Sequence, residues 1–225
     1  MTYRLHYAPD NASLVIRLAL EEIGASYATV LVDRATRAHK SSAYLALNPA
    51  GLIPALETPE GVLFETGAIL LWLADRHGQG APAPHAPDRG DFLKWLFYLA
   101  NTVHPTLRMS FYPEQYLDHS AGPLCAAAQA RFAGQLDILD TRAAPWFGAG
   151  RPSLLDPYLA CLMRWRALYP VHDPGYDPRR WPRLYTMLDR IEHSPATRAA
   201  IAAEGLGPHP FTAPVYADPP EGSAL

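Results

Sequence analysis

Cysteine is scarce in this sequence, and the cysteines that it has do not form a motif. Of the 225 residues only two are cysteine, Cys125 and Cys161, and no Cys-x-x-Cys spacing occurs. Structural zinc sites take Cys and His ligands in closely spaced pairs, so the sequence gives no indication of a metal site. Two separated thiols are typical of reduced, buried side chains, and we expect a cytoplasmic protein.

Long apolar runs and an excess of one charge are also missing. No stretch comes near the about 18 consecutive apolar residues of a membrane-spanning helix, and residues 1–7 lack the basic and apolar segments of a signal peptide. Lys and Arg number 19 against 22 Asp and Glu, a formal net charge of −3. We therefore expect neither a membrane nor a nucleic acid as partner.

The first third of the chain alternates between strand and helix patterns. The expected elements are strands at Tyr3–Tyr7 and Tyr27–Val32, a helix at Ser13–Glu22, a short irregular helix at Arg34–Ala46, a hairpin around Thr58–Gly61 and a helix at Gly67–His77. Apolar residues recur at helical spacing in the first helix, and Gly24 follows it as a C-terminal cap. This order predicts an α/β domain over residues 1–78.

Residues 79–90 are rich in Gly and Pro and predict a linker. The segments with helical character after it are Phe92–Met109, Leu124–Leu139, Pro157–Leu168 and Trp181–Glu204. Pro105 predicts a kink near Asn101 to Pro105, and Ser194-Pro195 predicts a break in the last segment. The tail from Gly205 carries five prolines and is expected to be extended. Residues 91–225 therefore predict an all-helical domain with an extended tail.

The most informative stretch is NPAGLIPAL, Asn48 to Leu56, followed by Glu65-Thr66. Proline cannot donate to a strand ladder, so Pro54 is expected at the start or edge of a strand. A cis Ile53–Pro54 bond would turn the backbone of Ile53 outward and leave its N–H and C=O free to pair with an extended ligand. Glu65-Thr66 is expected to open a helix, and a helix N-terminus binds carboxylates.

These residues, in this order, resemble the glutathione-binding half of the cytosolic glutathione transferases. The hallmark of that family is Asn-Pro-x-Gly-x-Val/Ile-Pro-x-Leu followed by Glu-Ser/Thr. The resemblance covers about residues 1–204 and implies the glutathione transferase fold, an α/β thioredoxin-like domain joined to an all-α domain. It also implies glutathione as co-substrate, a small hydrophobic electrophile as second substrate, and a homodimer, with Trp95, Phe97 and Tyr98 as candidates for exposed aromatic surface.

The resemblance assigns glutathione to particular residues. Ile53, ahead of Pro54, is expected to pair backbone to backbone with the cysteinyl part. Glu65 is expected to meet the γ-glutamyl ammonium, and Thr66 the γ-glutamyl carboxylate. The glycyl carboxylate is left to a cation of the polar segment. The candidates are Arg34 and Arg37, with Arg37 taken into the predicted site.

The catalytic position departs from the family patterns. The serine of several classes falls on Asp10, and the cysteine of the bacterial beta-type enzymes, which the chain otherwise resembles most, falls on Ala12. Asp10 would oppose a thiolate if it were close and ionised. Ser13 is the nearest hydroxyl donor, although it could equally be a helix cap. Tyr7 matches the strand-end tyrosine of the mammalian-type enzymes and is the competing donor.

The second substrate is expected between the two domains. His104, in the run Asn101 to Pro105, matches a beta-type histidine and could orient the thiol or an acidic group on the acceptor. The residues predicted to line this pocket are Pro9, Asn11, His104, Phe111, Tyr112, Tyr116 and Trp165. A separate motif, Ser153-x-x-Asp156, reads as the cap of a buried helix and predicts a role in folding.

Three functions fit these residues. The first is conjugation of glutathione to small electrophiles. The second is another glutathione-dependent reaction on the same fold, such as isomerisation, peroxide reduction or disulfide reduction. The third is a non-catalytic interaction module, which the missing serine and cysteine favour and the retained Ile53-Pro54 and Glu65-Thr66 oppose.

Overall fold

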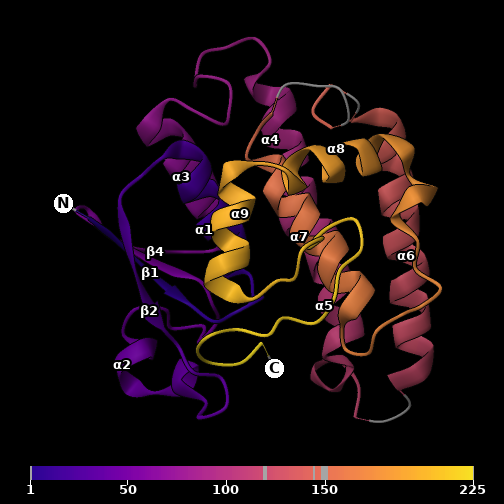
Figure 1. Ribbon diagram of the computed structural model, residues 1–225, viewed down its shortest axis with the longest axis horizontal. Coiled ribbons are helices and arrows are strands. Elements are labelled where there is room, and N and C mark those ends of the chain that lie inside the picture. The colour runs from indigo at the N-terminus through magenta and orange to yellow at the C-terminus, as the bar shows by residue number, and fades with distance from the viewer. Residues whose placement is uncertain (1, 119–120, 144, 148–151, 225) are drawn as a thin grey trace.

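The computed structural model describes residues 2–118, 121–143, 145–147 and 152–224. The first third of the chain forms a sheet domain with strands and helices in alternation (Figure 1). Its elements are β1 (Tyr3–Tyr7), α1 (Ser13–Ile23), β2 (Tyr27–Leu31), α2 (Ser42–Leu45), β3 (Ala55–Thr58), β4 (Gly61–Phe64) and α3 (Thr66–His77). The sheet order is β2-β1-β3-β4, with β1 parallel to β2 and antiparallel to β3. The predicted thioredoxin-like domain is confirmed.

Helix α1 crosses between the two parallel strands and fills the core of this domain. Leu14 and Leu18 are almost fully buried beneath the sheet, together with Leu5 of β1. The helix ends where Gly24 adopts a left-handed conformation with φ of 72°, which a residue without a Cβ adopts at little cost. The first residues of α1 are thereby fixed at the carboxyl end of β1.

The segment that leads into β3 is held by side chains on its neighbouring turn. The hydroxyl of Tyr44 and the amide of Asn48 both donate to the carbonyl oxygen of Leu52, each at 2.7 Å. The Ile53–Pro54 peptide bond that follows is cis. Ile53 precedes the ladder, because the pairing of β3 with β1 begins at Ala55. Two short helical turns replace the irregular helix predicted over residues 34–46.

The second half of the chain is helical. Its helices are α4 (Arg89–Tyr98), α5 (His104–Phe111), α6 (Ala121–Arg142), α7 (Leu155–Leu168), α8 (Pro182–Glu192) and α9 (Pro195–Glu204). Every residue of α7 is buried, and in Figure 1 this helix runs through the middle of the molecule. It contacts α1 of the sheet domain as well as α5 and α8, so the two domains share one core.

Pro105 interrupts the first long helix as predicted. Residues Leu99–Val103 form a wider, π-helical turn between α4 and α5. Proline has no N–H and clashes with the preceding turn, so the chain cannot continue with regular helical bonds there. The hydroxyl of Thr106 donates to the carbonyl oxygen of Thr102 at 2.8 Å and closes part of the gap. His104 is the first residue after this wider turn.

The start of α7 has the predicted cap. A side-chain oxygen of Asp156 accepts the N–H of Ser153 at 3.1 Å, and the hydroxyl of Ser153 accepts the N–H of Leu155 at 3.2 Å. Arg190 of α8 donates to the same Asp156 oxygen at 2.8 Å. Ser153 and Asp156 therefore tie the central helix to α8.

The tail after α9 forms neither helix nor strand over residues 205–224 and returns to the sheet domain. Arg164 of α7 donates to the carbonyl oxygens of Leu206, Pro210 and Val215 and holds its first part. Its end reaches the loop before α1, where the carbonyl oxygen of Ala224 accepts the side-chain N–H of Asn11 at 3.3 Å. No helix in the described part of the chain has the length and apolar character to cross a membrane.

Candidate active site

A cavity of about 360 Å³ lies between the sheet domain and the helical domain. The residues that line it include Asn11 and Ala12 before α1, Arg34, His39, Lys40 and Ile53 from the segment between β2 and β3, His104, Arg108, Phe111 and Tyr112 from α5 and its end, and Trp165 and Tyr169 from α7 and its end. A molecule in this cavity would touch both domains and the N-terminal end of α1.

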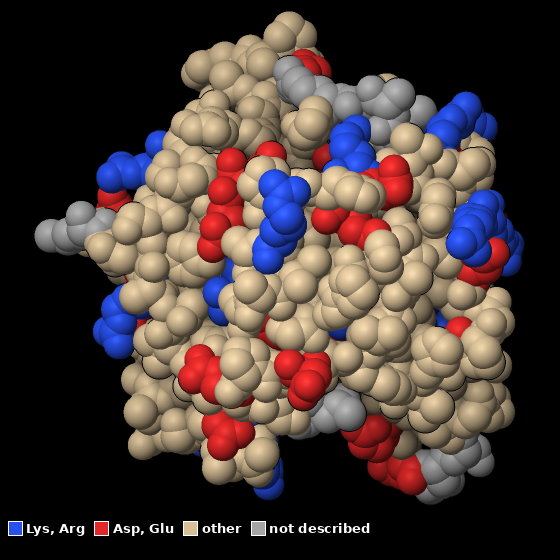
Figure 2. All heavy atoms as spheres, in the orientation of Figure 1, with Lys and Arg blue, Asp and Glu red and all other residues tan. Residues whose placement is uncertain are grey.

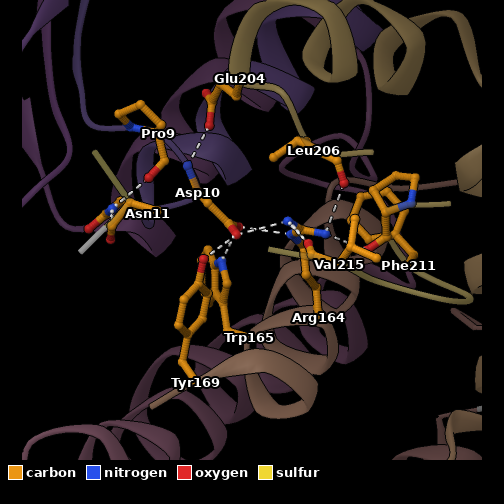
Figure 3. Close-up of polar contacts among 12 residues, drawn as sticks. Pro9, Asp10, Asn11, Arg164, Trp165, Tyr169, Glu204, Leu206, Phe211 and Val215 are labelled. Carbon is orange, nitrogen blue, oxygen red and sulfur yellow. Dashed lines mark hydrogen bonds and ion pairs between the residues drawn. The ribbon is translucent and has the colours of Figure 1, made fainter. Parts of the chain in front are cut away.

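Asp10, at the position of the family's serine, is buried and fully engaged (Figure 3). One carboxylate oxygen accepts Nε of Arg164 and Nε1 of Trp165, both at 2.9 Å, and the other accepts Nη2 of Arg164 at 2.9 Å and the hydroxyl of Tyr169 at 2.7 Å. Such a forked pair with arginine neutralises the carboxylate. Asp10 therefore brings little net negative charge to the cavity.

A second buried ion pair supports the same loop. Glu204, at the end of α9, accepts the backbone N–H of Asp10 at 2.8 Å and Nε of Arg17 at 2.6 Å. Asp10 has a φ of 49°, an uncommon value for a residue other than glycine. The contacts to both its backbone and its side chain hold this conformation, which sets the direction of Asn11 and Ala12 into the cavity.

Ser13 does not lie where the sequence predicted a hydrogen-bond donor to the glutathione sulfur. Its hydroxyl donates to the carbonyl oxygen of Ala8 at 3.0 Å and accepts the N–H of Ala8 at 3.2 Å. The side chain is fully buried and is not part of the cavity wall. The prediction that this hydroxyl stabilises a thiolate is therefore wrong for this arrangement, because its proton is used inside the loop.

Tyr7 is also turned away from the cavity. It is buried against α1, with the guanidinium of Arg17 4.8 Å from the centre of its ring, and its hydroxyl donates to Glu221 of the tail. Burial, followed by the hydrogen bond to Glu221, raises the pKa of the Tyr7 hydroxyl well above its usual value. The geometry contradicts Tyr7 as the alternative donor, since its proton is committed to the tail.

The N-terminus of α3 forms a second part of the site, outside the cavity wall. The first intrahelical bond of α3 runs from the N–H of Ile69 to the carbonyl oxygen of Glu65, so the N–H groups before Ile69 have no acceptor within the helix. Glu65 is exposed and has a φ of 72°, a strained value for a residue other than glycine. Thr66 beside it is buried. This end of α3 can bind a carboxylate and an ammonium group side by side.

The cations that line the cavity do not include Arg37, the one taken into the predicted site. Arg37 is exposed and does not line the cavity, whereas Arg34 does. The guanidinium of Arg34 donates to the side-chain oxygen of Asn11 at 2.8 Å and to the hydroxyl of Tyr112 at 3.3 Å. Lys40 also lines the cavity and was missed by the sequence reasoning, although it lies within the polar segment predicted to cover the site.

His104 lies in the cavity wall, where the sequence placed it. Its Nδ1 is 3.0 Å from the hydroxyl of Tyr158, and its ring packs beside Trp165. Burial, followed by the positive charge of Arg108, lowers the pKa of His104 to about 4. The pKa of Tyr158 is raised by burial and then by the charge of Glu65. His104 is therefore neutral at pH 7 and can exchange a hydrogen bond, but not a charge, with a molecule in the cavity.

Most of the other residues predicted to line the pocket lie in the cavity wall. Asn11, Phe111, Tyr112 and Trp165 do so. Two predictions were wrong. Pro9 is buried in the loop, where its carbonyl oxygen accepts the amide N–H of Asn11, and Tyr116 is exposed; neither residue lines the cavity. Tyr169 and Arg108 were missed. The aromatic end of α7 was the available signal for Tyr169.

The predicted surface aromatics differ in their exposure. Trp95, one of the proposed surface aromatics, is buried in the core, whereas Phe97 is 53% exposed. No cluster of three or more His, Cys, Asp or Glu side chains suited to a metal ion occurs among the residues with described positions.

The sequence matches known proteins over most of its length. Residues 1–75 match the family model of the glutathione S-transferase N-terminal domain. The maleylacetoacetate isomerase of Pseudomonas aeruginosa is 30% identical over 213 residues, which cover 88% of this chain and 94% of that protein. The disulfide-bond oxidoreductase YfcG of Escherichia coli is 27% identical over 216 residues, which cover 90% and 96%.

The fold gives the same assignment. A sphingomonad glutathione S-transferase complexed with glutathione superposes with a TM-score of 0.73 at 31% identity, over 91% of this chain and 100% of that one. The superposition covers parts of both domains of this chain. The chain belongs to the glutathione transferase family.

Proposed function

We propose that this protein is a glutathione transferase that binds glutathione along Ile53, Glu65 and Thr66 and presents its sulfur to the N-terminal end of α1. The observation that carries the proposal is that Ile53 lines the same cavity as Asn11 and Ala12. A peptide-like ligand paired with the backbone of Ile53 would direct its side chain at this helix N-terminus. Positive dipole ends of helices favour thiolates.

Each charged group of glutathione then has a partner of opposite charge or a set of hydrogen-bond donors. Glu65 takes the γ-glutamyl ammonium, and Thr66 with the free N–H groups of α3 takes the γ-glutamyl carboxylate. Ile53 and Pro54 lie just ahead of β3, so the backbone of Ile53 is not paired in the ladder. Arg34, which lines the cavity, takes the glycyl carboxylate, with Lys40 as the neighbouring cation. This assignment replaces Arg37 in the predicted set.

The thiol must lose its proton before it can attack. At a pKa of about 8.5 roughly 3% of a thiol is ionised at pH 7, and a shift of two units requires about 2.7 kcal/mol of preference for the anion. We assign this preference to the backbone N–H groups at the start of α1. The engagement of Asp10 with Arg164 supports the assignment, because a free carboxylate here would raise the thiol pKa.

The reaction is nucleophilic attack by the thiolate on a small electrophile in the helical half of the cavity. The sulfur forms a bond to the electrophilic carbon, and the leaving group departs with its electron pair or, in an addition, the neighbouring atom takes a proton from solvent. Neutral His104 offers a hydrogen bond to the acceptor, and the rings of Phe111 and Trp165 pack against its apolar part.

A glutathione-dependent isomerase is the second candidate. The maleylacetoacetate isomerase relative, at 30% identity over most of both chains, favours it. A reductase that forms a mixed disulfide with the protein is less favoured, because Ala12 stands where the beta-type enzymes have cysteine. A non-catalytic module remains the third candidate, since both usual catalytic residues are replaced.

A panel of reactions separates these candidates. We expect the protein to bind immobilised glutathione and to conjugate a chlorinated nitroaromatic faster than the uncatalysed reaction does. Turnover of a cis-configured diketo acid without conjugation would instead make it an isomerase, and turnover of a hydroperoxide would make it a peroxidase. Binding without any of these activities would support a non-catalytic module.

We further propose that the protein is a cytoplasmic homodimer. Family membership and the exposed aromatic side chains Phe64 and Phe97 support the dimer, and the two free thiols favour a reducing compartment. Sedimentation at micromolar concentration should give a dimer, and a monomer there would contradict it.

A further inference from the structure

The cavity gathers positive charge from both domains. Arg34 and Lys40 line it from the sheet domain, and Arg108 lines it from α5. Among the described residues that line it, the only acid is Asp10, whose carboxylate is paired with Arg164 inside the protein. The wall therefore has an excess of positive charge.

This excess is local to the cavity. The whole chain has a formal net charge of −3, and Figure 2 shows acidic and basic side chains interspersed over one face of the molecule, with no continuous basic area. Because the surface has no continuous basic area, the three cations around the cavity do not belong to a surface that attracts polyanions in general. Charges placed in a cavity of low dielectric act more strongly on a ligand than the same charges on an open surface.

The cations fall into two groups, and glutathione accounts for one of them. Arg34 and Lys40 belong to the segment between β2 and β3, which also carries Ile53. Arg108 stands on α5, one helical turn after His104 and on the wall with Phe111 and Tyr169, where the second substrate would lie. The proposed function assigns the glycyl carboxylate to Arg34, with Lys40 beside it, and gives Arg108 no role, although Arg34 and Arg108 both contact Tyr112.

Arg108 is arranged to bind an anion. Its guanidinium lies 5.3 Å from the centre of the Tyr112 ring, and one of its N–H groups donates to the side chain of Gln115 at 3.2 Å. These contacts orient the planar group, which has five N–H donors in all. Arginine oriented in this way recognises carboxylates with two parallel hydrogen bonds.

We propose that the acceptor substrate is an acidic electrophile, with an apolar or aromatic body and a carboxylate that binds Arg108. This inference rests on the proposed transferase function and narrows its substrate class. The carboxylate lies against α5, the electrophilic carbon faces the sulfur at the start of α1, and His104 lies between them. An uncharged acceptor would leave Arg108 without a counter-charge.

The test compares an acid with its own ester. In 4-chloro-3-nitrobenzoate the glutathione sulfur attacks the ring carbon, the C–S bond forms, and the C–Cl bond breaks to release chloride. The thiol proton goes to solvent. The methyl ester reacts at the same carbon by the same step. Each kcat/KM is divided by the uncatalysed rate constant with glutathione, which removes the difference in ring reactivity.

We expect this normalised value to be about tenfold or more higher for the acid, which corresponds to about 1.4 kcal/mol. Arg108→Gln should remove most of the preference by lowering the acid's value, and Arg108→Lys should restore part of it. Arg142→Gln, which removes one exposed charge at the end of α6, should keep it. Equal values for acid and ester, or a preference that survives Arg108→Gln, would overturn the proposal.

A binding measurement separates this proposal from the proposed reaction. The two glutathione conjugates, acid and methyl ester, are prepared chemically, and their dissociation constants are measured by calorimetry. Tighter binding of the acid conjugate that depends on Arg108, without any turnover, would uphold the charge preference and contradict the transferase. Turnover with equal affinity for both conjugates would uphold the transferase and contradict the charge preference.

Discussion

At the scale of single residues, the arrangement around Asp10 decides what the site can do. An ionised carboxylate without a partner would be costly to bury, and here Arg164 supplies two hydrogen bonds and the opposite charge. The sequence showed only that an acid replaces the usual catalytic serine. It could not show the partner, since Arg164 lies 154 positions away and nothing local to either residue marks the pair.

Removing Arg164, the partner of Asp10, should therefore lower the free energy of unfolding far more than removing one partner of an exposed ion pair. We expect Arg164→Met to lower the free energy of unfolding by about 3–5 kcal/mol, because Asp10 is left buried and uncompensated. Arg179→Met, which breaks an exposed pair with Asp177, should cost about 0–1 kcal/mol. Urea denaturation of both variants measures the difference. Similar losses in the two would contradict the account of a buried ion pair between Asp10 and Arg164.

Ser13 gives a prediction that separates support of the loop from catalysis. We expect Ser13→Ala to lower the free energy of unfolding by about 0.5–1.5 kcal/mol, since it removes the hydrogen bonds to Ala8. The pKa of the bound glutathione thiol, followed by its ultraviolet absorbance, should stay the same. A rise of about one unit or more in that pKa would show that the hydroxyl reaches the sulfur after all.

At the scale of helices and strands, the elements predicted best are those with signals in their own sequence. Gly24 ends α1, and Pro105 causes the wider turn before α5. Ser194 caps α9 by accepting the N–H of Thr197 at 3.1 Å. The path of the tail had no such signal, because its position depends on Arg164 and Glu192 from distant helices.

The cap of α7 makes stability depend on pH. Burial raises the pKa of Asp156 to about 7 in the folded protein, despite the opposing effect of Arg190, whereas an unfolded chain has about 3.9. The folded state thus holds a proton that the unfolded state has lost. Between about pH 4 and pH 7 this group should reduce stability as the pH rises, by up to about 1.4 kcal/mol per unit.

The matched variant is Asp156→Asn. It keeps the shape of the side chain and removes its titration, so we expect its free energy of unfolding to change less between about pH 4 and pH 7 than that of the wild type. Denaturant midpoints across this range test it. A wild-type profile that rises with pH in step with the variant would show that Asp156 is ionised throughout and that Arg190 outweighs burial.

At the scale of the whole molecule, the fold and one half of the site could be predicted, because both rest on a contiguous motif. Ile53, Glu65 and Thr66 lie within a short stretch whose order alone suggests glutathione. The other half of the site is assembled from α5, α7 and the tail, and the roles of Arg108 and Tyr169 follow only from how these elements pack. Both halves serve one claim, that glutathione binds across Ile53 and the N-terminus of α3.

Calorimetric titration with glutathione tests that claim most directly. We expect the wild type to bind, and Glu65→Ala to weaken binding about tenfold or more, as the loss of an ion pair to the γ-glutamyl ammonium requires. Glu60→Ala is the matched control, since Glu60 is a nearby exposed acid that pairs with Arg76 and should leave the dissociation constant unchanged. A wild type that does not bind glutathione, or an equal dissociation constant for wild type and Glu65→Ala, would contradict the account.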